Sequence, residues 1–380
     1  MTHSAAAAAP GATIEIVDAP ERLAELAPSW DRLWADADGL VFQSHRWILA
    51  WWRTAPGRSR LKLRLALLWR GEALVAILPL AIRRKGAIRT LEWAARDHSD
   101  FCDALVAPGL RPAELEPLWQ AVLASGGFDL VYLNRLLPDA LAQGLAARPA
   151  SVRLRPYWRQ EENYRVAGSW PSGDAWLDSQ SKKTRQNYRR GRKFIEESGP
   201  LRFRLLGDDE PLAPVLEHVA ALKRKWLERH GRQSDLFDEG AAALPALVGC
   251  LRELGLLRLF VLECGPAIVA VSINLVQRNR MMAFVTTYDP DHERASPGML
   301  LMCDYIAWSI DRGLAEVDFL CGGEEFKRRF ATRSLILSSH AGARTPLGHL
   351  ALAADAARRR FQAWRSERGA PAPVAAVAAE

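Results

Sequence analysis

The chain has 380 residues, of which 49% are hydrophobic and 25% are charged, so its composition is that of a folded protein of about two domains. The nearly uncharged apolar runs are too short to span a bilayer, and the N-terminus has no signal-peptide pattern, so we expect a cytoplasmic protein. Five scattered cysteines without a C-x-x-C pair exclude a disulfide framework and a zinc site. Residues 1–12 and 368–380 are rich in Ala and Pro and are predicted to be disordered tails.

The net charge of +7 is concentrated in one segment. Residues 181–193 (SKKTRQNYRRGRK) carry seven Lys and Arg side chains and no acid, so the rest of the chain is formally neutral. A solvated helix face is the simplest interpretation, and an anionic acceptor or an anionic membrane surface are the functional alternatives. DNA is not expected, because only Tyr188 interleaves the charges.

Strands and helices alternate along the first half, as hydrophobic periodicity and turn residues indicate. The predicted strands are residues 13–17, 61–69, 73–82 and 128–133; the predicted helices are residues 21–35, 42–52 and 112–124.

The second half repeats this order. The predicted strands are residues 201–206, 256–263, 267–276, 280–288 and 316–320; the predicted helices are residues 212–229, 241–254 and 297–312. An offset of 194 residues superimposes the two hairpins with these identities: Arg64/Arg258, Leu65/Leu259, Leu68/Leu262, Gly71/Gly265, Ala73/Ala267, Val75/Val269 and Ala76/Ala270. The pattern predicts an α/β fold with mixed sheets, built from a duplicated domain with its boundary near residues 150–180.

Several motifs are missing from the sequence. It has no phosphate-binding P-loop, no G-x-S-x-G elbow, no H-E-x-x-H and no dinucleotide-binding glycine pattern. Residues 289–293 (DPDHE) suit either a metal site or a solvated loop, and the loop is favoured. We therefore expect no metal.

Residues 281–300 (MMAFVTTYDPDHERASPGML) carry the positive signal. A strand leads through a polar loop to Ser296-Pro297-Gly298, which opens an apolar helix with Ser as N-cap and Pro in the first turn. The N-terminus of a helix is a ready phosphate site, Gly298 permits close approach, and Arg294 adds a positive charge. A well-capped structural helix is the alternative.

The order of elements in the second half resembles the core of the GNAT acyltransferases. More closely, the chain resembles the CelD/BcsL-type acetyltransferases named for cellulose biosynthesis, through SKKTRQNYRRGRK, TYDP…SPGMLL and GLAEVDFLCGGEEFKRRF. The resemblance covers residues 175–335 well and residues 13–135 loosely, and Fem-type aminoacyltransferases share the two-half pattern. It implies a tandem GNAT-like fold: a degenerate half (13–165), a catalytic domain (175–345), and a C-terminal helix with a tail (346–380).

The resemblance also implies acetyl-CoA or another acyl-CoA as co-substrate. Strand 281–288 would splay from its neighbour to receive the thioester, and the CoA pyrophosphate would lie on the backbone of residues 294–299. Pro297 stands where the general family turn has its first Gly. The implied cofactor-binding residues are Thr287, Tyr288, Arg294, Ser296, Pro297, Gly298 and Met299.

Acyl transfer to an amine needs a base, donors for the oxyanion and an acid for the thiolate. Asp318 and Glu324 (or Glu325) are the carboxylate candidates, although a structural role suits Asp318 equally. Tyr288 or Tyr305 would protonate the thiolate. The predicted substrate-binding residues are Lys182, Lys183, Arg189, Arg232 and Lys327. Alternatively, Lys327 pairs with Glu324. Helix 181–193 alternatively binds the 3′-phosphate of CoA.

The sequence thus predicts an acyl-CoA-dependent acyltransferase that modifies an amine, or a hydroxyl, of a polysaccharide, a nucleotide-sugar or a similar anionic acceptor. A Fem-like aminoacyltransferase using aminoacyl-tRNA, and a non-catalytic binding protein of the GNAT fold, are the alternatives.

Overall fold

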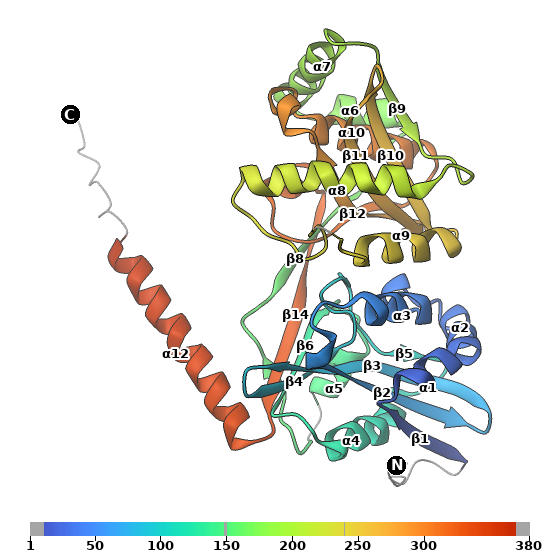
Figure 1. Cartoon of the computed structure of the whole chain (residues 1–380), viewed down its shortest axis with the longest axis vertical. Helices are drawn as coiled ribbons and strands as arrows, with labels where there is room; N and C mark the ends of the chain where they lie inside the picture. Colours follow the sequence, from blue (N-terminus) through green and yellow to red (C-terminus); the bar gives the residue numbers. More distant parts are fainter. Residues whose placement is uncertain (1–10, 148–149, 239, 370–380) are drawn as a thin grey trace.

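A computed structural model describes residues 11–147, 150–238 and 240–369. The predicted tails, 1–12 and 368–380, lie almost wholly outside these residues. Figure 1 shows two lobes stacked along the long axis, one from each half of the chain, with strands β8 and β14 running between them. No helix of the described residues is long and apolar enough to cross a bilayer.

The first lobe is a sheet in the order β1-β2-β3-β4-β6, antiparallel except for the parallel pair β4–β6. Side chains alternate across β2, so that Leu63 and Leu65 join the core under α2 and α3, while Ala66 and Leu68 join the core under α4. Its strands are β1 (Ala12–Val17), β2 (Leu61–Arg70), β3 (Ala73–Lys85), β4 (Ile88–Trp93), the short β5 (Leu105–Val106) and β6 (Leu130–Leu136). Its helices are α1 (Pro20–Glu25), α2 (Ala27–Asp36), α3 (His45–Thr54), α4 (Leu115–Ser125) and α5 (Ala142–Ala146), with 3₁₀ turns η1 (Val41–Gln43), η2 (Arg58–Arg60) and η3 (Pro112–Glu114).

The second lobe repeats the arrangement, with the sheet order β9-β10-β11-β12-β13 and a parallel pair β12–β13. Its strands are β9 (Leu201–Leu205), β10 (Leu257–Cys264), β11 (Ala267–Gln277), β12 (Arg280–Tyr288) and β13 (Glu316–Cys321). Its helices are α6 (Gly173–Ser179), α7 (Lys182–Glu196), α8 (Leu212–Arg229), α9 (Ala243–Glu253), the 3₁₀ turn η4 (Pro290–Ala295), α10 (Pro297–Asp311) and α11 (Glu325–Phe330).

The two hairpins are equivalent to the residue, as the offset of 194 predicts. The register of β2–β3 shifts between Leu68 and Trp69, and that of β10–β11 shifts between Leu262 and Glu263. Both hairpins turn at a glycine of positive φ, Gly71 at 57° and Gly265 at 55°. Bulges are conserved among related strands, so a bulge at the same place in both hairpins confirms the duplication.

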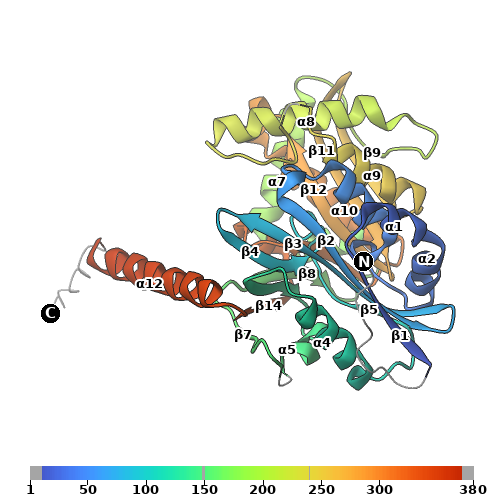
Figure 2. The same cartoon turned by 60° about the horizontal axis from the view of Figure 1, so that its bottom comes forward.

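The lobes exchange a strand with each other. Strand β8 (Glu161–Ala167) follows the first half but pairs with β13 of the second lobe. Strand β14 (Arg333–Ala343) follows the second half but pairs through residues 338–343 with β6 of the first lobe, and through residues 333–337 with β8. The exchange joins both lobes into one continuous sheet, to which the short β7 (Arg155–Pro156) adds at β14. After β14 the chain ends in α12 (Pro346–Gly369), which Figure 2 shows leaving the body.

The predicted helix at residues 21–35 is wrong in one respect, since it is broken into α1 and α2. Pro28 lies in the first turn of α2, where its missing N–H costs nothing, but the same ring would break a continuous helix. Strands β4, β8 and β14 were not predicted. The five cysteines are free, and four of them are buried.

Candidate active site

Strands β12 and β13 diverge from each other after a short parallel contact. They pair only at Arg280, Met281 and Met282 of β12, so the remaining residues of β12 have no strand on that side. A bulge at Phe284 interrupts the pairing of β12 with β11 just where the two parallel strands separate. Splaying of strand 281–288, which the sequence predicted, is therefore present.

The gap between these strands opens into a cavity of about 950 Å³ that both lobes line. Residues 283–288 of β12 form one wall, and the start of α10 forms the next. Helix α8 and the loop after it face them. The first lobe contributes four residues to the lining: Asp97, His98, Asp100 and Arg135.

The turn into α10 borders the cavity, and the N–H groups of Ser296 and Met299 are bonded to the carbonyls of Glu293 and Ser296. Ser296 adopts a left-handed conformation (φ 54°) and makes no side-chain capping bond, so the predicted N-cap position is right but the predicted capping bond is not formed. Ser296, Gly298 and Met299 line the cavity, so the start of α10 opens into it. A Cβ at Gly298 would lie 3.0 Å from the Tyr288 ring, which leaves little room for any side chain.

Five of the seven predicted cofactor residues line the cavity: Thr287, Tyr288, Ser296, Gly298 and Met299. The Thr287 hydroxyl is buried without a hydrogen-bond partner. The Tyr288 hydroxyl accepts a bond from Trp226 Nε1 (3.1 Å) and donates to Glu293 (3.5 Å), and burial raises its pKa. Pro297 is buried behind the turn and Arg294 is exposed outside the cavity lining, so the structure does not bring these two into the cavity.

The assignment of Asp318 as the base is corrected by the structure. Its side chain is fully buried, outside the cavity. It accepts a hydrogen bond from Asn163 Nδ2 (2.5 Å) and forms ion pairs with Arg165 Nε (2.9 Å) and Arg280 (3.7 Å). Burial raises its pKa, and Arg165 opposes that effect. A substrate in the cavity cannot contact this buried carboxylate. Its role is structural, because its pairs with Arg165 and Arg280 connect β13 to β8 and β12.

The predicted site residues Glu324, Glu325 and Lys327 line the cavity. The Lys327 ammonium is mostly buried and donates to the Cys321 carbonyl (2.5 Å), and it pairs with Glu324 at 3.0 Å. The predicted alternative, a Glu324–Lys327 pair, is therefore present. Tyr305 also lines the cavity.

Three predicted substrate-binding residues lie outside the cavity lining: Lys182, Lys183 and Arg189 of α7. This helix lies at the far end of the second lobe (Figure 1), and the backbone of α7 at Gly191 approaches η4 so closely that a Cβ would meet Ala295 O at 2.4 Å. The three cations therefore lie outside the cavity, on a helix that packs against η4 at Gly191. Arg232 does line the cavity.

The sequence analysis missed the contribution of the first lobe. Asp100 accepts a hydrogen bond from the Cys321 N–H at 3.1 Å, at the end of β13, and burial raises its pKa against the opposing charge of Arg135. His98 Nε2 is buried without a partner, and burial lowers the pKa of this imidazole. The available signal was the polar run Arg96–Asp103 (RDHSDFCD) directly after an apolar strand, in the place that the donor loop takes in the second half.

Helix α8 and the loop after it each place a cation at the cavity, Lys223 and Arg232. Lys223 lies 4.6 Å from the centre of the Trp226 ring, and Arg232 lies 5.6 Å from it. Burial lowers the pKa of Lys223. In the described part of the chain, neither cation pairs with a carboxylate.

The acidic loop at residues 289–293 is held by cations of α8. Lys225 pairs with Asp289 (2.8 Å) and Asp291 (2.5 Å), and Arg229 pairs with Asp291 (3.1 Å). No group of three potential metal ligands occurs among the described residues.

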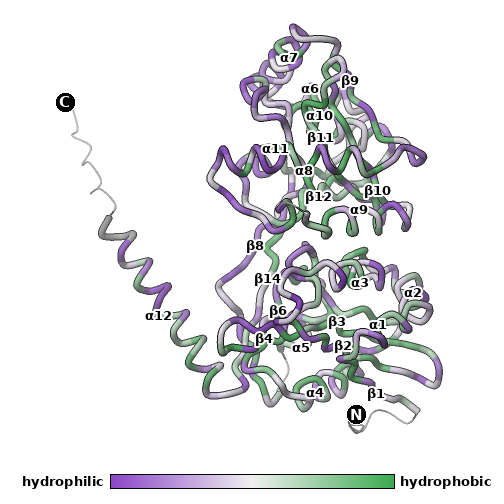
Figure 3. Tube along the Cα trace, in the orientation of Figure 1, coloured by the Kyte–Doolittle hydropathy of each residue, from purple (hydrophilic) through white to green (hydrophobic). Residues whose placement is uncertain are grey.

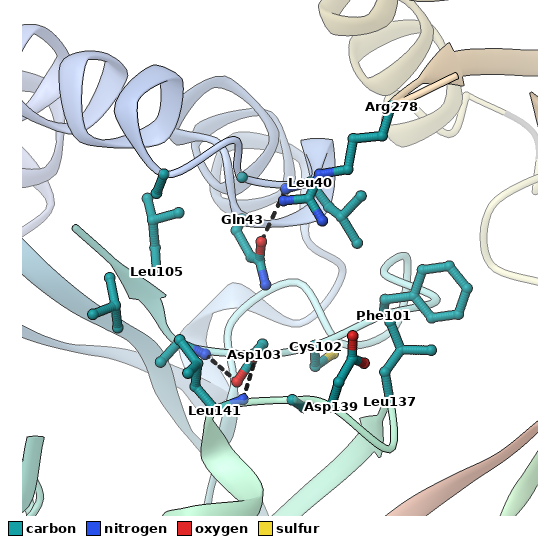
Figure 4. A pocket seen from close by; sticks show the side chains of 15 residues that line it. Leu40, Gln43, Phe101, Cys102, Asp103, Leu105, Leu137, Asp139, Leu141 and Arg278 are labelled. Atoms are coloured by element: carbon teal, nitrogen blue, oxygen red, sulfur yellow. Dashed lines mark hydrogen bonds between the residues drawn. The ribbon is translucent and has the colours of Figure 1, made fainter. Parts of the chain in front are cut away.

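A second, smaller cavity of about 160 Å³ lies mainly in the first lobe (Figure 4). Its buried carboxylate, Asp103, accepts bonds at 2.8 Å from the N–H groups of Ala104, Leu141 and Ala142, and burial raises its pKa to about 6. These hydrogen bonds to Asp103 hold the start of α5 against residues 103–104. This cavity is far too small for an acyl-CoA.

Residues 182–328 match the family model described as Acetyltransferase (GNAT) domain. Residues 182–328 of the second lobe thus correspond to a GNAT acetyltransferase domain. No protein of curated function matches the sequence at a significant level.

Among solved structures, FemX matches with a TM-score of 0.54 and 8% identity, over 82% of this chain and 94% of FemX. A C-terminal domain from Agrobacterium fabrum, named for a lysylphosphatidylglycerol synthetase, matches with a TM-score of 0.53 and 12% identity, over 88% of this chain and 96% of that one. L-PGS from Bacillus licheniformis matches with a TM-score of 0.52 and 12% identity, over 87% and 92%. At such identities these matches show the fold, and they extend it over both lobes and not only the GNAT domain.

Proposed function

We propose that this protein transfers an acyl group, acetyl in the simplest case, from CoA to an amine of an anionic acceptor. The observation that supports this is the coincidence of two features in one cavity: the unpaired edge of β12 and the amino end of α10. The first can receive a thioester carbonyl, and the second can receive a pyrophosphate.

The donor would lie along β12. Backbone N–H groups beyond Met282 would bind the thioester oxygen, which becomes negative as the tetrahedral intermediate forms, and Ser296–Met299 would hold the pyrophosphate. The Thr287 hydroxyl, which has no partner, is available to the pantetheine arm. Tyr288 stands between the strand and the turn, and its raised pKa keeps it protonated as the acid for the departing thiolate.

The acceptor would enter from the side of the first lobe. Asp100 is the base best placed to take a proton from the ammonium group of the acceptor. Its carboxylate lies at the end of β13, where β12 and β13 separate, and its pKa is raised. Lys223 and Arg232 would bind an anionic group of the acceptor, since neither pairs with a carboxylate among the described residues. A polysaccharide precursor that carries a phosphate or a carboxylate fits this arrangement, in line with the resemblance to the CelD/BcsL-type acetyltransferases.

The decisive experiment is calorimetric titration with CoA. Gly298→Asp should abolish binding, since a carboxylate would repel the pyrophosphate at the turn, while Gly298→Ala adds only the contact with Tyr288 and should bind CoA within about tenfold of wild type. Equal CoA affinity of a folded Gly298→Asp protein would overturn the donor site.

A second candidate is transfer from an aminoacyl-tRNA, in the manner of the Fem-type proteins. The fold shared with FemX and the lysylphosphatidylglycerol synthetase domain over both lobes favours it. The titration separates the two, because an aminoacyl-tRNA enzyme would not bind CoA, with or without an aspartate at position 298.

A further inference from the structure

Helix α12 extends outside both lobes. It leaves β14 and runs away from the body in both views (Figures 1 and 2). One face packs on the first lobe: Gly348 lies against the Asp129 carbonyl, and Asp355 accepts bonds from Tyr157 Oη (2.8 Å) and Trp158 Nε1 (3.1 Å). Arg359, one turn further, lies 4.9 Å from the centre of the Trp158 ring.

The opposite face carries an apolar stripe exposed to solvent. The side chains of Leu350 and Phe361 are 66% and 56% exposed, although both are large and apolar. Figure 3 shows apolar positions recurring along the polar helix. Six exposed residues follow one another at spacings of three and four: Leu347, Leu350, Ala354, Ala357, Phe361 and Trp364.

This spacing is that of the seam of a two-stranded coiled coil. A helix that lies on a membrane needs a broad face of large apolar side chains, whereas here the middle of a narrow stripe is alanine. Alanine lets two helix backbones approach closely. The stripe therefore fits a second helix better than a lipid surface.

The charges indicate which helix that is and how it runs. Residues 346–357 contain one aspartate and no Lys or Arg, whereas residues 358–365 contain four arginines. In a parallel pair of α12 helices, Arg360 of one chain would face Arg365 of the other and repel it. In an antiparallel pair, each arginine-rich half would lie against the half without cations, and the helix dipoles would also be opposed.

We propose that α12 pairs antiparallel with α12 of a second copy of this chain, forming a two-fold symmetric dimer. Leu347 would lie against Trp364, and Leu350 against Phe361, at both ends of the seam, with alanine on alanine at its centre. The same patch is used on both chains, as a two-fold axis requires.

Sedimentation velocity of the full chain from about 1 to 200 μM tests the dimer. We expect a concentration-dependent dimer that Leu350→Glu with Phe361→Glu weakens at least about 30-fold, since two charges would be buried in the seam. The matched control, His349→Glu with Gln362→Glu, adds the same charge at exposed positions off the stripe and should still dimerise. CoA affinity and melting temperature should be equal in all three proteins.

Cross-linking with a short bis-maleimide tests the orientation. A mixture of Leu350→Cys and Phe361→Cys chains should cross-link between the two variants, and neither variant should cross-link with itself; self-linking of each would mean a parallel pair. A monomer at all concentrations overturns the proposal. So does a monomer that binds vesicles of phosphatidylglycerol through the stripe, because the occupant would then be lipid.

Discussion

The carboxylate of Asp100 accepts a hydrogen bond from the N–H of Cys321 at 3.1 Å, although 221 positions separate the two residues in the chain. The Cys321 thiol returns a bond to the Asp100 carbonyl at 3.0 Å. Because Cys321 ends β13, this contact places an acidic group of the first lobe beside the splayed strands of the second. The first lobe therefore completes the cavity of the GNAT domain instead of merely duplicating its fold.

The first prediction concerns Asp100→Asn. A base whose pKa is raised loses its function as the pH falls through that raised value, so wild-type turnover should decline on the acid side well above the ordinary range of aspartate. The Asn variant should lose about 10²–10⁴-fold in kcat and retain CoA affinity. The measurement is release of the CoA thiol against pH.

Stability gives an independent readout for the same variant. A carboxyl with a raised pKa in the folded state binds more protons there than in the unfolded chain, so stability falls as the pH rises through the interval between the two pKa values. Asn removes this cost, and the melting temperature at pH 8 should stay equal or rise. Asp97→Asn is the control, since Asp97 lines the same cavity three residues away. Equal kcat in Asp100→Asn and Asp97→Asn would exclude Asp100 as the base.

Local patterns predicted most elements of both lobes, but not β4, the strand exchange or the shared cavity. Hydrophobic runs and helical periodicity placed β2, β3, α8 and β12 almost to the residue, because these segments pack within their own half. Strands β8 and β14 lie in what the sequence presents as connections, and their pairing depends on contacts over more than 150 residues. Asp318 was misassigned because a carboxylate on a strand looks the same whether it faces a cavity or a buried arginine.

The second prediction concerns Lys223→Met. Burial lowers the pKa of Lys223 in the folded state. Between this lowered pKa and the ordinary pKa of lysine, the folded state binds fewer protons than the unfolded chain. The charged ammonium group therefore destabilises the fold at neutral pH. The Met variant should therefore melt at an equal or higher temperature. With CoA saturating the donor turn, inorganic phosphate should stabilise the wild type and not the variant. Stabilisation by phosphate that persists in Lys223→Met with Arg232→Gln would place the anion elsewhere.

The third prediction tests the structural role of Asp318. Removing its charge takes one of two carboxylates from the buried Arg165, whose other partner is Glu316 at 3.2 Å, and breaking a buried pair costs about 3–5 kcal/mol. Asp318→Asn should thus melt roughly 5 °C lower. Glu324→Gln changes a carboxylate that is 51% exposed and should melt like the wild type. An Asp318→Asn protein of normal stability without turnover would restore the catalytic assignment.

The last prediction concerns α7, whose cations the sequence assigned to the acceptor. Lys182, Lys183 and Arg189 lie outside the cavity lining but on the helix that packs against η4, next to the proposed pyrophosphate turn. No carboxylate of the described residues pairs with them, so their charge is available to the 3′-phosphate of CoA. Changing all three to Gln should weaken CoA binding about 3–10-fold at low salt and less at high salt, because exposed charges are screened over ~8 Å at physiological ionic strength. Dephospho-CoA, which lacks that phosphate, should bind equally to the variant and the wild type.

The control for the α7 variant changes Arg60, Arg84 and Lys85, three exposed cations of the first lobe, to Gln. It should change neither the affinity for CoA nor the affinity for dephospho-CoA. If the α7 variant binds CoA normally but loses affinity for the acceptor, the original assignment is right, and if neither affinity changes, α7 is a solvated face.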